Sequence, residues 1–386
     1  MSLVKYVDRK NTDCAKWDNL MEMFGEDDLL AMWVADMDFQ APESVINALT
    51  DYVSKGVFGY YCPPDSYYQS FIDWEKSMHG FEIQKDWIRF SPGVVSGFHW
   101  IVQMMTNPGD AVIVFKPVYY PFFNAINNND RKLITSDLVL KDNSYSMDFD
   151  DFEKKIIENN VKMFILCSPH NPVGRVWKME ELKTILDICR KHNVFVISDE
   201  IHHDLVYGNN EHIPSLSVGE YSDMMIMLTA PSKTFNLASG QNSIIVIPDD
   251  TLRQKWDAYI NKIHVTTGNS FGYIAAQAAY KHGKEWLSEV KDIIYGNYEY
   301  MKDTFCKYLP ELSVYPLEGT YLAWIDFSSY VSGAELAEFL QKKCKLAFDY
   351  GEWFGGEKYA SFARMNLATS RENVETAVKA IIENLK

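Results

Sequence analysis

Short apolar runs rich in β-branched residues alternate along this chain with stretches of helical periodicity. The clearest runs cover residues 111–115, 162–167, 194–198 and 224–228. Short, mostly apolar runs of this kind, bounded by turn residues, are typical of strands buried on both faces of a parallel sheet. Helical stretches such as 180–192 separate them. Residues 59–280 therefore predict an α/β fold around a mainly parallel central sheet.

The two ends of the chain carry a different pattern. Pro42 is expected to open a helix that runs to about residue 55, with Val45, Leu49 and Val53 on one apolar stripe. The later segments read as a long amphipathic helix, a strand and two more helices: 285–309, 320–325, 334–343 and 371–385. We therefore expect a large α/β domain at 47–283 and a small α+β domain formed by 1–46 and 284–386.

Composition narrows the class of protein. The 386 residues are 47% apolar, which suits a globular chain of two domains. With 37 basic and 53 acidic residues the formal net charge is −16, which disfavours nucleic acid and membrane surfaces as partners. No stretch approaches the 18 apolar residues of a membrane span, and the first ten residues contain no apolar signal core. Six scattered cysteines without a Cys-x-x-Cys pair suit reduced thiols in the cytoplasm.

Polar residues follow directly on the apolar runs. Ligands of open α/β sheets bind beyond the carboxyl ends of the strands, so these residues are expected to line one crevice. They are Tyr119, Asn171, Asp199, His202 and Lys233. Each also has an ordinary structural explanation when taken alone: a core tyrosine, a turn-making asparagine, a helix N-cap, a structural histidine and a solvated lysine.

Together these groups match the needs of a pyridoxal 5'-phosphate site, which requires a lysine for the aldehyde, a carboxylate for the pyridine nitrogen and a wall for the ring. Lys233, in a Ser-Lys-Thr turn, suits the first role and Asp199 the second. His202 and Asn171 are candidate donors to the phenolic oxygen. Tyr119 is the candidate for stacking against the ring.

The phosphate cup is expected at Ser91–Gly97, before a helical stretch at 98–105. Gly93 would permit a tight turn, and the free amides of Val94, Val95 and Ser96 would face a dianion. Ser232, beside the lysine, is a further candidate ligand. An ordinary glycine-containing turn between strand and helix is the alternative. The loop matches neither a P-loop nor a Gly-x-Gly-x-x-Gly motif, which counts against a nucleotide or nicotinamide site.

The chain as a whole resembles the fold-type I pyridoxal phosphate enzymes of the aminotransferase class I/II superfamily. Within it, the chain resembles the MalY/PatB branch of cystathionine and cysteine-S-conjugate β-lyases. The segments that carry the resemblance are Trp33–Phe39, Val57–Tyr60, Ser168–Trp177, Ser198–His202, Ser232–Asn236 and Phe362–Asn366.

The resemblance implies further roles. Arg364 would bind the substrate α-carboxylate, with Asn171 nearby, and Ala35 and Asp36 would line the substrate entrance. Tyr60 would reach the phosphate bound by a second subunit, which implies a homodimer with shared sites. Gln241 stands where aspartate-type aminotransferases carry a phosphate-binding arginine, and residues 238–240 read Ala-Ser-Gly where Ala-Gly is common.

The resemblance also implies the reaction: cleavage of L-cystathionine or L-cysteine-type thioethers to thiol, pyruvate and ammonia. Lys233 would move the Cα proton, and Tyr119 would help orient or protonate the departing sulfur. The core residues do not distinguish this lyase from an aminotransferase, which therefore stays the alternative. A lyase with an added regulatory, protein-binding role is the other.

Overall fold

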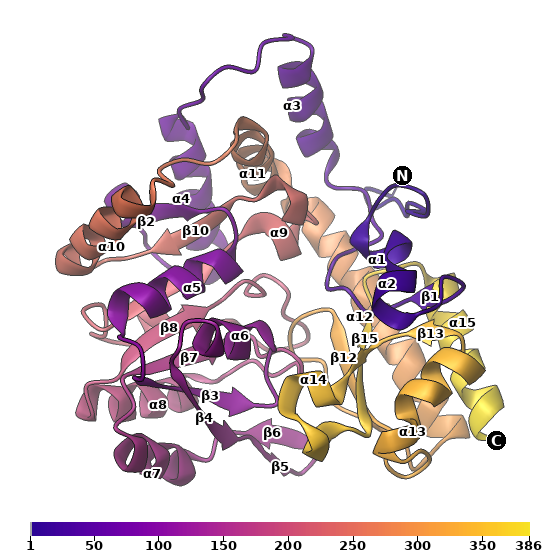
Figure 1. Cartoon of the computed structure of the whole chain (residues 1–386). Helices are drawn as coiled ribbons and strands as arrows, with labels where there is room; N and C mark the ends of the chain where they lie inside the picture. The colour runs from indigo at the N-terminus through magenta and orange to yellow at the C-terminus, as the bar shows by residue number, and fades with distance from the viewer. Residues whose placement is uncertain (1) are drawn as a thin grey trace.

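A computed structural model describes residues 2–386, and its centre is a seven-stranded sheet (Figure 1). The strands lie in the order β2 (Ile88–Ser91), β10 (Ser243–Val246), β9 (Met225–Thr229), β8 (Phe195–Asp199), β7 (Met163–Cys167), β3 (Ala111–Lys116) and β4 (Lys132–Asp137). Strand β10 is antiparallel to both neighbours, and the other adjacent strands are parallel. The mainly parallel sheet is confirmed, and the four predicted runs fall on β3, β7, β8 and β9 within one residue at each end.

Helices cover both faces of this sheet because its strands are apolar on both sides. The side chains at 112 and 114 of β3 pack with α5 (Val94–Met105), α6 (Pro121–Asn127) and α10 (Asp250–Ile263). Those at 111, 113 and 115 pack with α7 (Phe149–Asn159) and α8 (Met179–Lys191). This alternation is what a strand buried between two helical layers requires.

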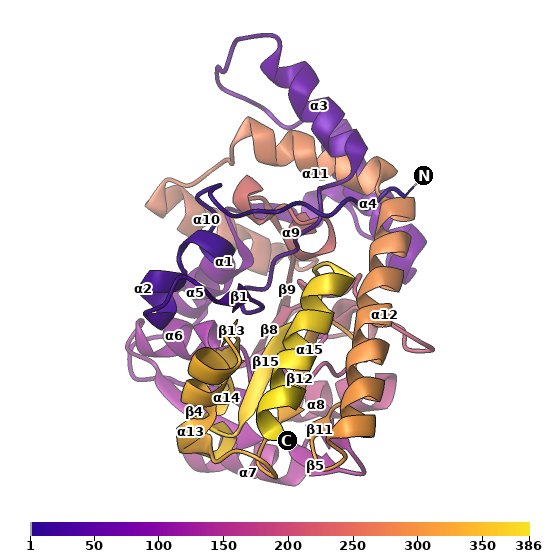
Figure 2. The ribbon, with the colours of Figure 1, turned by 90° about the vertical axis from the view of Figure 1, so that its right-hand side faces the viewer.

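A second, antiparallel sheet of four strands lies beside the first. Its order is β11 (Ser313–Val314), β12 (Leu322–Asp326), β15 (Phe362–Asn366) and β14 (Asp349–Tyr350). The long helix α12 (Lys284–Tyr308) leads to this sheet and packs against the last helix, α15 (Arg371–Leu385), as Figure 2 shows. The segment expected as a helix at 334–343 is α13 (Gly333–Glu338) continued by a π-helical turn, Phe339–Lys343.

N-terminal residues contact this smaller unit through a short strand. Strand β1 (Leu30–Ala31) pairs in parallel with β13 (Leu346–Ala347). The residues at which the two units divide stay a prediction. The remaining elements are α1 (Ala15–Asp18), α2 (Leu20–Phe24), α3 (Glu43–Val53), α4 (Asp65–His79), β5 (Val139–Lys141), β6 (Ser144–Ser146), α9 (Pro231–Thr234), α11 (Ser270–His282) and α14 (Gly351–Gly355).

Helix α3 and the loop that follows it extend away from the body of the molecule (Figure 1). The predicted apolar stripe holds only at its start: Val45 is buried, Leu49 is half-buried and Val53 is exposed. Among residues 2–386, no helix is both long and apolar enough to cross a bilayer.

Candidate functional site

A cavity opens where the parallel strands of the large sheet end. Strands β2, β9, β8, β7 and β3 all point their carboxyl ends to this edge, so the residues that follow them meet there. The lining contains Ala35, Pro92, Gly93, Val94, Val95, Tyr119, Cys167, Asn171, Asp199, Ile201, His202, Ser232, Lys233, Ala238, Gln241, Asn242 and Ser243. The residues that sequence analysis assigned to strand ends therefore do share one cavity.

Lys233 lies in α9, the short helix that follows β9. Its Nζ donates a hydrogen bond to the carbonyl oxygen of Ala35 at 2.6 Å, and the hydroxyl of Tyr321 donates to the same oxygen at 2.7 Å. Burial lowers the pKa of Lys233 to about 8, although the carboxylate of Asp36 opposes the shift. An amine with this pKa exchanges protons readily near neutral pH, as a group that moves a substrate proton must.

Asp199 ends β8 and is almost fully buried. Its Oδ1 accepts a hydrogen bond from the backbone amide of Ile201 at 3.1 Å. Burial raises the pKa of this carboxyl to about 7. A cation placed against it would restore the ionised form, because an opposite charge favours the carboxylate.

Asn171 and His202 present hydrogen-bonding groups to the same cavity. The side-chain oxygen of Asn171 accepts from Nη1 of Arg364 at 2.9 Å, which fixes the amide and leaves its NH₂ to donate. Burial lowers the pKa of His202 well below its usual value, so the ring is neutral, and its Nδ1 is buried without a partner. Both side chains can therefore donate a hydrogen bond to an acceptor atom in the cavity.

The segment predicted as the phosphate cup borders the cavity, but its local structure differs from the prediction. Helix α5 begins at Val94, so residues 94–97 belong to the helix and not to the loop that precedes it. Gly93 has extended backbone, φ −176°, and not the turn expected of it. Val94 and Val95 line the cavity, whereas Ser96, in the same first turn, does not. The free amides of this first turn give the helix N-terminus its affinity for anions.

Gln241 was noted in the sequence only for its position, and several other residues of the lining were left without a role. Cys167, the last residue of β7, was read only as the end of an apolar run. Gln241, Asn242 and Ser243 lead into β10, whose start meets the carboxyl ends of its neighbours because it is antiparallel. The signal for them lies in the strand direction, which the sequence pattern did not show.

Arg364, on β15, stands behind Asn171 and is buried. Its Nη2 donates to the carbonyl oxygen of Trp33 at 3.2 Å and pairs with the carboxylate of Asp349, whereas its Nε has no partner. Burial raises the pKa of Asp349 to about 6, against the effect of the guanidinium. Arg364 does not line the cavity itself, and Asn171 links the two.

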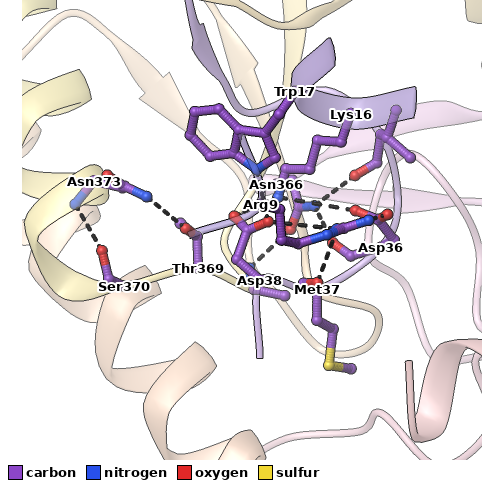
Figure 3. A network of polar contacts seen from close by, with 12 residues as sticks. Arg9, Lys16, Trp17, Asp36, Met37, Asp38, Asn366, Thr369, Ser370 and Asn373 are labelled. Atoms are coloured by element: carbon purple, nitrogen blue, oxygen red, sulfur yellow. Dashed lines mark hydrogen bonds and ion pairs between the residues drawn. The ribbon is translucent and has the colours of Figure 1, made fainter. Parts of the chain in front are cut away.

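The predicted entrance residues Ala35 and Asp36 belong to an entrance segment, residues 33–38, that a polar network holds in place (Figure 3). Asp36 turns its carboxylate to Nη1 of Arg9 at 2.8 Å, outside the cavity, whereas Ala35 lines it. The fully buried carboxylate of Asp38 accepts from Nζ of Lys16 at 2.7 Å. Trp17 Nε1 donates to the same carboxylate at 2.9 Å.

Two of the aromatic residues predicted for the site occupy very different positions. Tyr119 lines the cavity, and its backbone amide donates to the carbonyl oxygen of Asn171 at 3.1 Å. Tyr60 lies in the loop after α3, is fully exposed and does not line the cavity of its own chain.

Comparisons with known proteins agree with this geometry. The family described as aminotransferase class I and II matches residues 28–381. Cystathionine β-lyase PatB of Bacillus subtilis is 38% identical over 99% of this chain and 99% of its own length. Protein MalY of Escherichia coli is 31% identical over 99% of this chain and 98% of its own length.

Two solved structures are similar along their whole length. The crystal structure of cystalysin from Treponema denticola, which contains pyridoxal 5'-phosphate, has a TM-score of 0.95 and 37% identity over 100% of this chain and 98% of cystalysin. The pyridoxal phosphate-bound C–S lyase of Staphylococcus hominis has a TM-score of 0.93 and 33% identity over 99% of this chain and 97% of its own. The predicted fold class and superfamily are confirmed.

Proposed function

The chain belongs to the aminotransferase class I and II family, and we propose that it is a pyridoxal 5'-phosphate-dependent carbon–sulfur β-lyase. Its substrates would be L-cystathionine or related L-cysteine thioethers, and its products a thiol, pyruvate and ammonia. The observation that carries this proposal is the similarity, over the whole chain, to the cystathionine β-lyase PatB. The structural likeness to C–S lyases supports the same reaction.

The residues of the cavity fit the cofactor. Asp199 offers a buried carboxylate without a cation, and the first-turn amides of α5 with Ser232 offer donors for a phosphate. Lys233 offers an amine for the aldehyde, while Asn171 and His202 offer donors for a phenolic oxygen. When bound, the cofactor supplies an electron-withdrawing ring that stabilises negative charge at the substrate Cα.

The chain's own residues would then bind the amino acid and move its protons. Nζ of Lys233 takes the proton from Cα and then donates a proton to the departing sulfur. Asn171, which Arg364 holds from behind, would bind the α-carboxylate together with that guanidinium and so limit rotation of the substrate about its Cα. Tyr119, in the cavity wall, orients the ring and the leaving group.

We propose that the enzyme is a homodimer whose sites are completed by Tyr60 of the opposite subunit. Val57, Phe58 and Tyr60 are exposed on the loop after α3, and Phe58 stacks on Phe271, also exposed, at 5.8 Å. Exposed apolar and aromatic side chains that lie together on an extended loop are typical of a protein–protein interface. A second copy of the chain would bury them. Equilibrium sedimentation of the wild-type protein should give twice the mass of one chain.

We also propose a cytoplasmic location. All six cysteines are unpaired, and Cys167 contributes a thiol to the wall of the cavity. A reducing compartment keeps such thiols free.

One set of assays tests the reaction. The holoenzyme would be incubated with L-cystathionine, with L-cysteine, and with L-alanine plus 2-oxoglutarate, and pyruvate, thiol, ammonia and glutamate would be measured. Pyruvate and ammonia from the sulfur amino acids, faster than glutamate from L-alanine, are the expected result. Robust glutamate formation without pyruvate from either sulfur amino acid would instead identify an aminotransferase.

A further inference from the structure

A second group of titratable side chains lies buried beside the catalytic lysine and has no part in the mechanism above. Glu75 and His79 stand one turn apart on α4, and His203 and Asp204 follow β8. The side chains of Glu75, His203 and Asp204 are withdrawn from solvent, and that of His79 is 6% exposed. We call these four residues the histidine–carboxylate cluster.

The orientation of His203 is fixed by its environment. Its Nδ1 lies 2.6 Å from the carbonyl oxygen of Glu200, an atom that only accepts, so Nδ1 carries a proton. Its Nε2 lies 3.1 Å from Oε1 of Glu75 and 3.4 Å from Oδ2 of Asp204. Neither contact has hydrogen-bond geometry, and Nε2 has no hydrogen-bond partner. Nε2 therefore points between two carboxylates, a position that suits a proton or a metal ion.

Glu75 supplies an independent observation. Its carboxylate is fully buried, and neither Oε1 nor Oε2 has a hydrogen-bond partner. Burying a carboxylate without donors is costly, and buried charges in proteins are paired or bound to a metal. Both of its oxygens are thus available to a cation that would also meet Nε2 of His203.

We propose that Glu75, His79 and His203 bind a divalent metal ion of the zinc class. One ligand atom from each of the three lies within 4.8 Å of the others. Zinc bonds of about 2.0–2.1 Å to nitrogen and oxygen imply tetrahedral edges of about 3.3 Å. The distance from Nε2 of His203 to Oε1 of Glu75, 3.1 Å, is close to this edge.

The surroundings of the cluster match those of known metal sites. A ligating histidine commonly donates its second ring nitrogen to a backbone carbonyl, as His203 does to Glu200. The carboxylates of Glu75 and Asp204 would balance the two positive charges of the ion. Lys291 also faces Asp204 and adds a positive charge on that side.

The ion would act on structure rather than on the substrate. Asp204 accepts from Nε2 of His79 at 2.9 Å and from Oγ1 of Thr234 at 2.7 Å. Thr234 follows Lys233 in α9, so the cluster supports the turn that carries the catalytic amine. The metal would thus order this turn and stabilise the folded chain.

The test uses the purified holoenzyme and zinc chloride. After treatment with a chelator, the wild type and the variants Glu75→Gln and His203→Gln would be dialysed against zinc buffered by a competing chelator, and bound metal would be measured by elemental analysis. We expect about one zinc per chain in the wild type and at least a tenfold weaker affinity in both variants. His282→Gln, which alters an exposed histidine, is the matched control and should bind like the wild type.

Cobalt provides a measurement that needs no variant. Co²⁺ bound to the wild type should give the visible d–d absorption of a tetrahedral site, and zinc should raise the midpoint of thermal unfolding by a few degrees. The proposal is overturned if Glu75→Gln binds zinc as tightly as the wild type. It is equally overturned if binding disappears when the exposed thiols Cys62 and Cys306 are replaced by serine, or if no tetrahedral cobalt spectrum forms.

Discussion

The buried carboxyl of Asp199 predicts an unusual pH dependence for the stability of the cofactor-free protein. Burial raises its pKa to about 7 in the folded chain, against an ordinary value of 3.8. Between these two values the folded state retains a proton that the unfolded state has lost. Stability must therefore fall as pH rises through this range, which is opposite to the usual behaviour of a paired carboxylate.

The size of the effect follows from the same shift. Well inside the interval each pH unit costs about 1.4 kcal/mol of unfolding free energy. Because the folded carboxyl is already half ionised at pH 7, the loss between pH 5 and pH 7 is about 2 kcal/mol. The substitution Asp199→Asn keeps the shape of the side chain and removes its ionisable carboxyl group. Other groups titrate in both proteins and cancel in the difference between them.

Urea denaturation of the cofactor-free wild type and of Asp199→Asn at pH 5, 6, 7 and 8 measures this difference. We expect the stability of the variant relative to the wild type to increase by about 2 kcal/mol from pH 5 to pH 7 and to level off above it. In the holoenzyme the cation of the cofactor ring should remove most of this slope. A difference that stays flat from pH 5 to pH 8 in the cofactor-free protein would refute the reasoning.

Three further changes test other parts of the structure. Asp38→Asn leaves Lys16 charged and buried without its partner, so urea denaturation should show a loss of about 3–5 kcal/mol. Gly97→Ala places a methyl group 2.7 Å from a side chain of β9 and should cost about 1–3 kcal/mol, whereas Gly93→Ala, with open space around it, should keep its unfolding midpoint. Arg364→Lys should raise KM for the sulfur amino acid more than it lowers kcat, because an ammonium keeps the positive charge but lacks the paired N–H donors of a guanidinium. A fall in kcat as large as the rise in KM would contradict a role in binding.

The positions of the main site residues were predictable because they depend on local pattern and sheet topology. Lys233, Asp199, Asn171 and Tyr119 each follow a short apolar run, and the parallel arrangement of those runs brings their ends together. One rule about strand ends therefore located most of the cavity. The resemblance added Arg364, whose sequence surroundings carry no pattern that indicates a ligand.

The remaining features depend on contacts between distant segments, which hydrophobic periodicity does not encode. The pairing of Lys16 with Asp38 was not foreseen, because a lysine in a short helix is ordinarily solvated. The exposure of Val53 was missed because an apolar stripe was assumed to face the chain's own core. The start of α5 at Val94 was missed because the glycines nearby were read as loop residues.

The entrance segment joins the two halves of the site through its backbone carbonyl groups. The oxygen of Trp33 accepts from Arg364, and the oxygen of Ala35 accepts from Lys233. The side-chain amide of Asn366 donates to the next carbonyls along, those of Val34 and Asp36. A shift of this short segment would therefore move the partners of the carboxylate-binding arginine and of the proton-transferring lysine together. Because residues 33–38 lie at the start of the chain, far in sequence from both side chains, the position of the site depends on the N-terminal residues as much as on the central sheet.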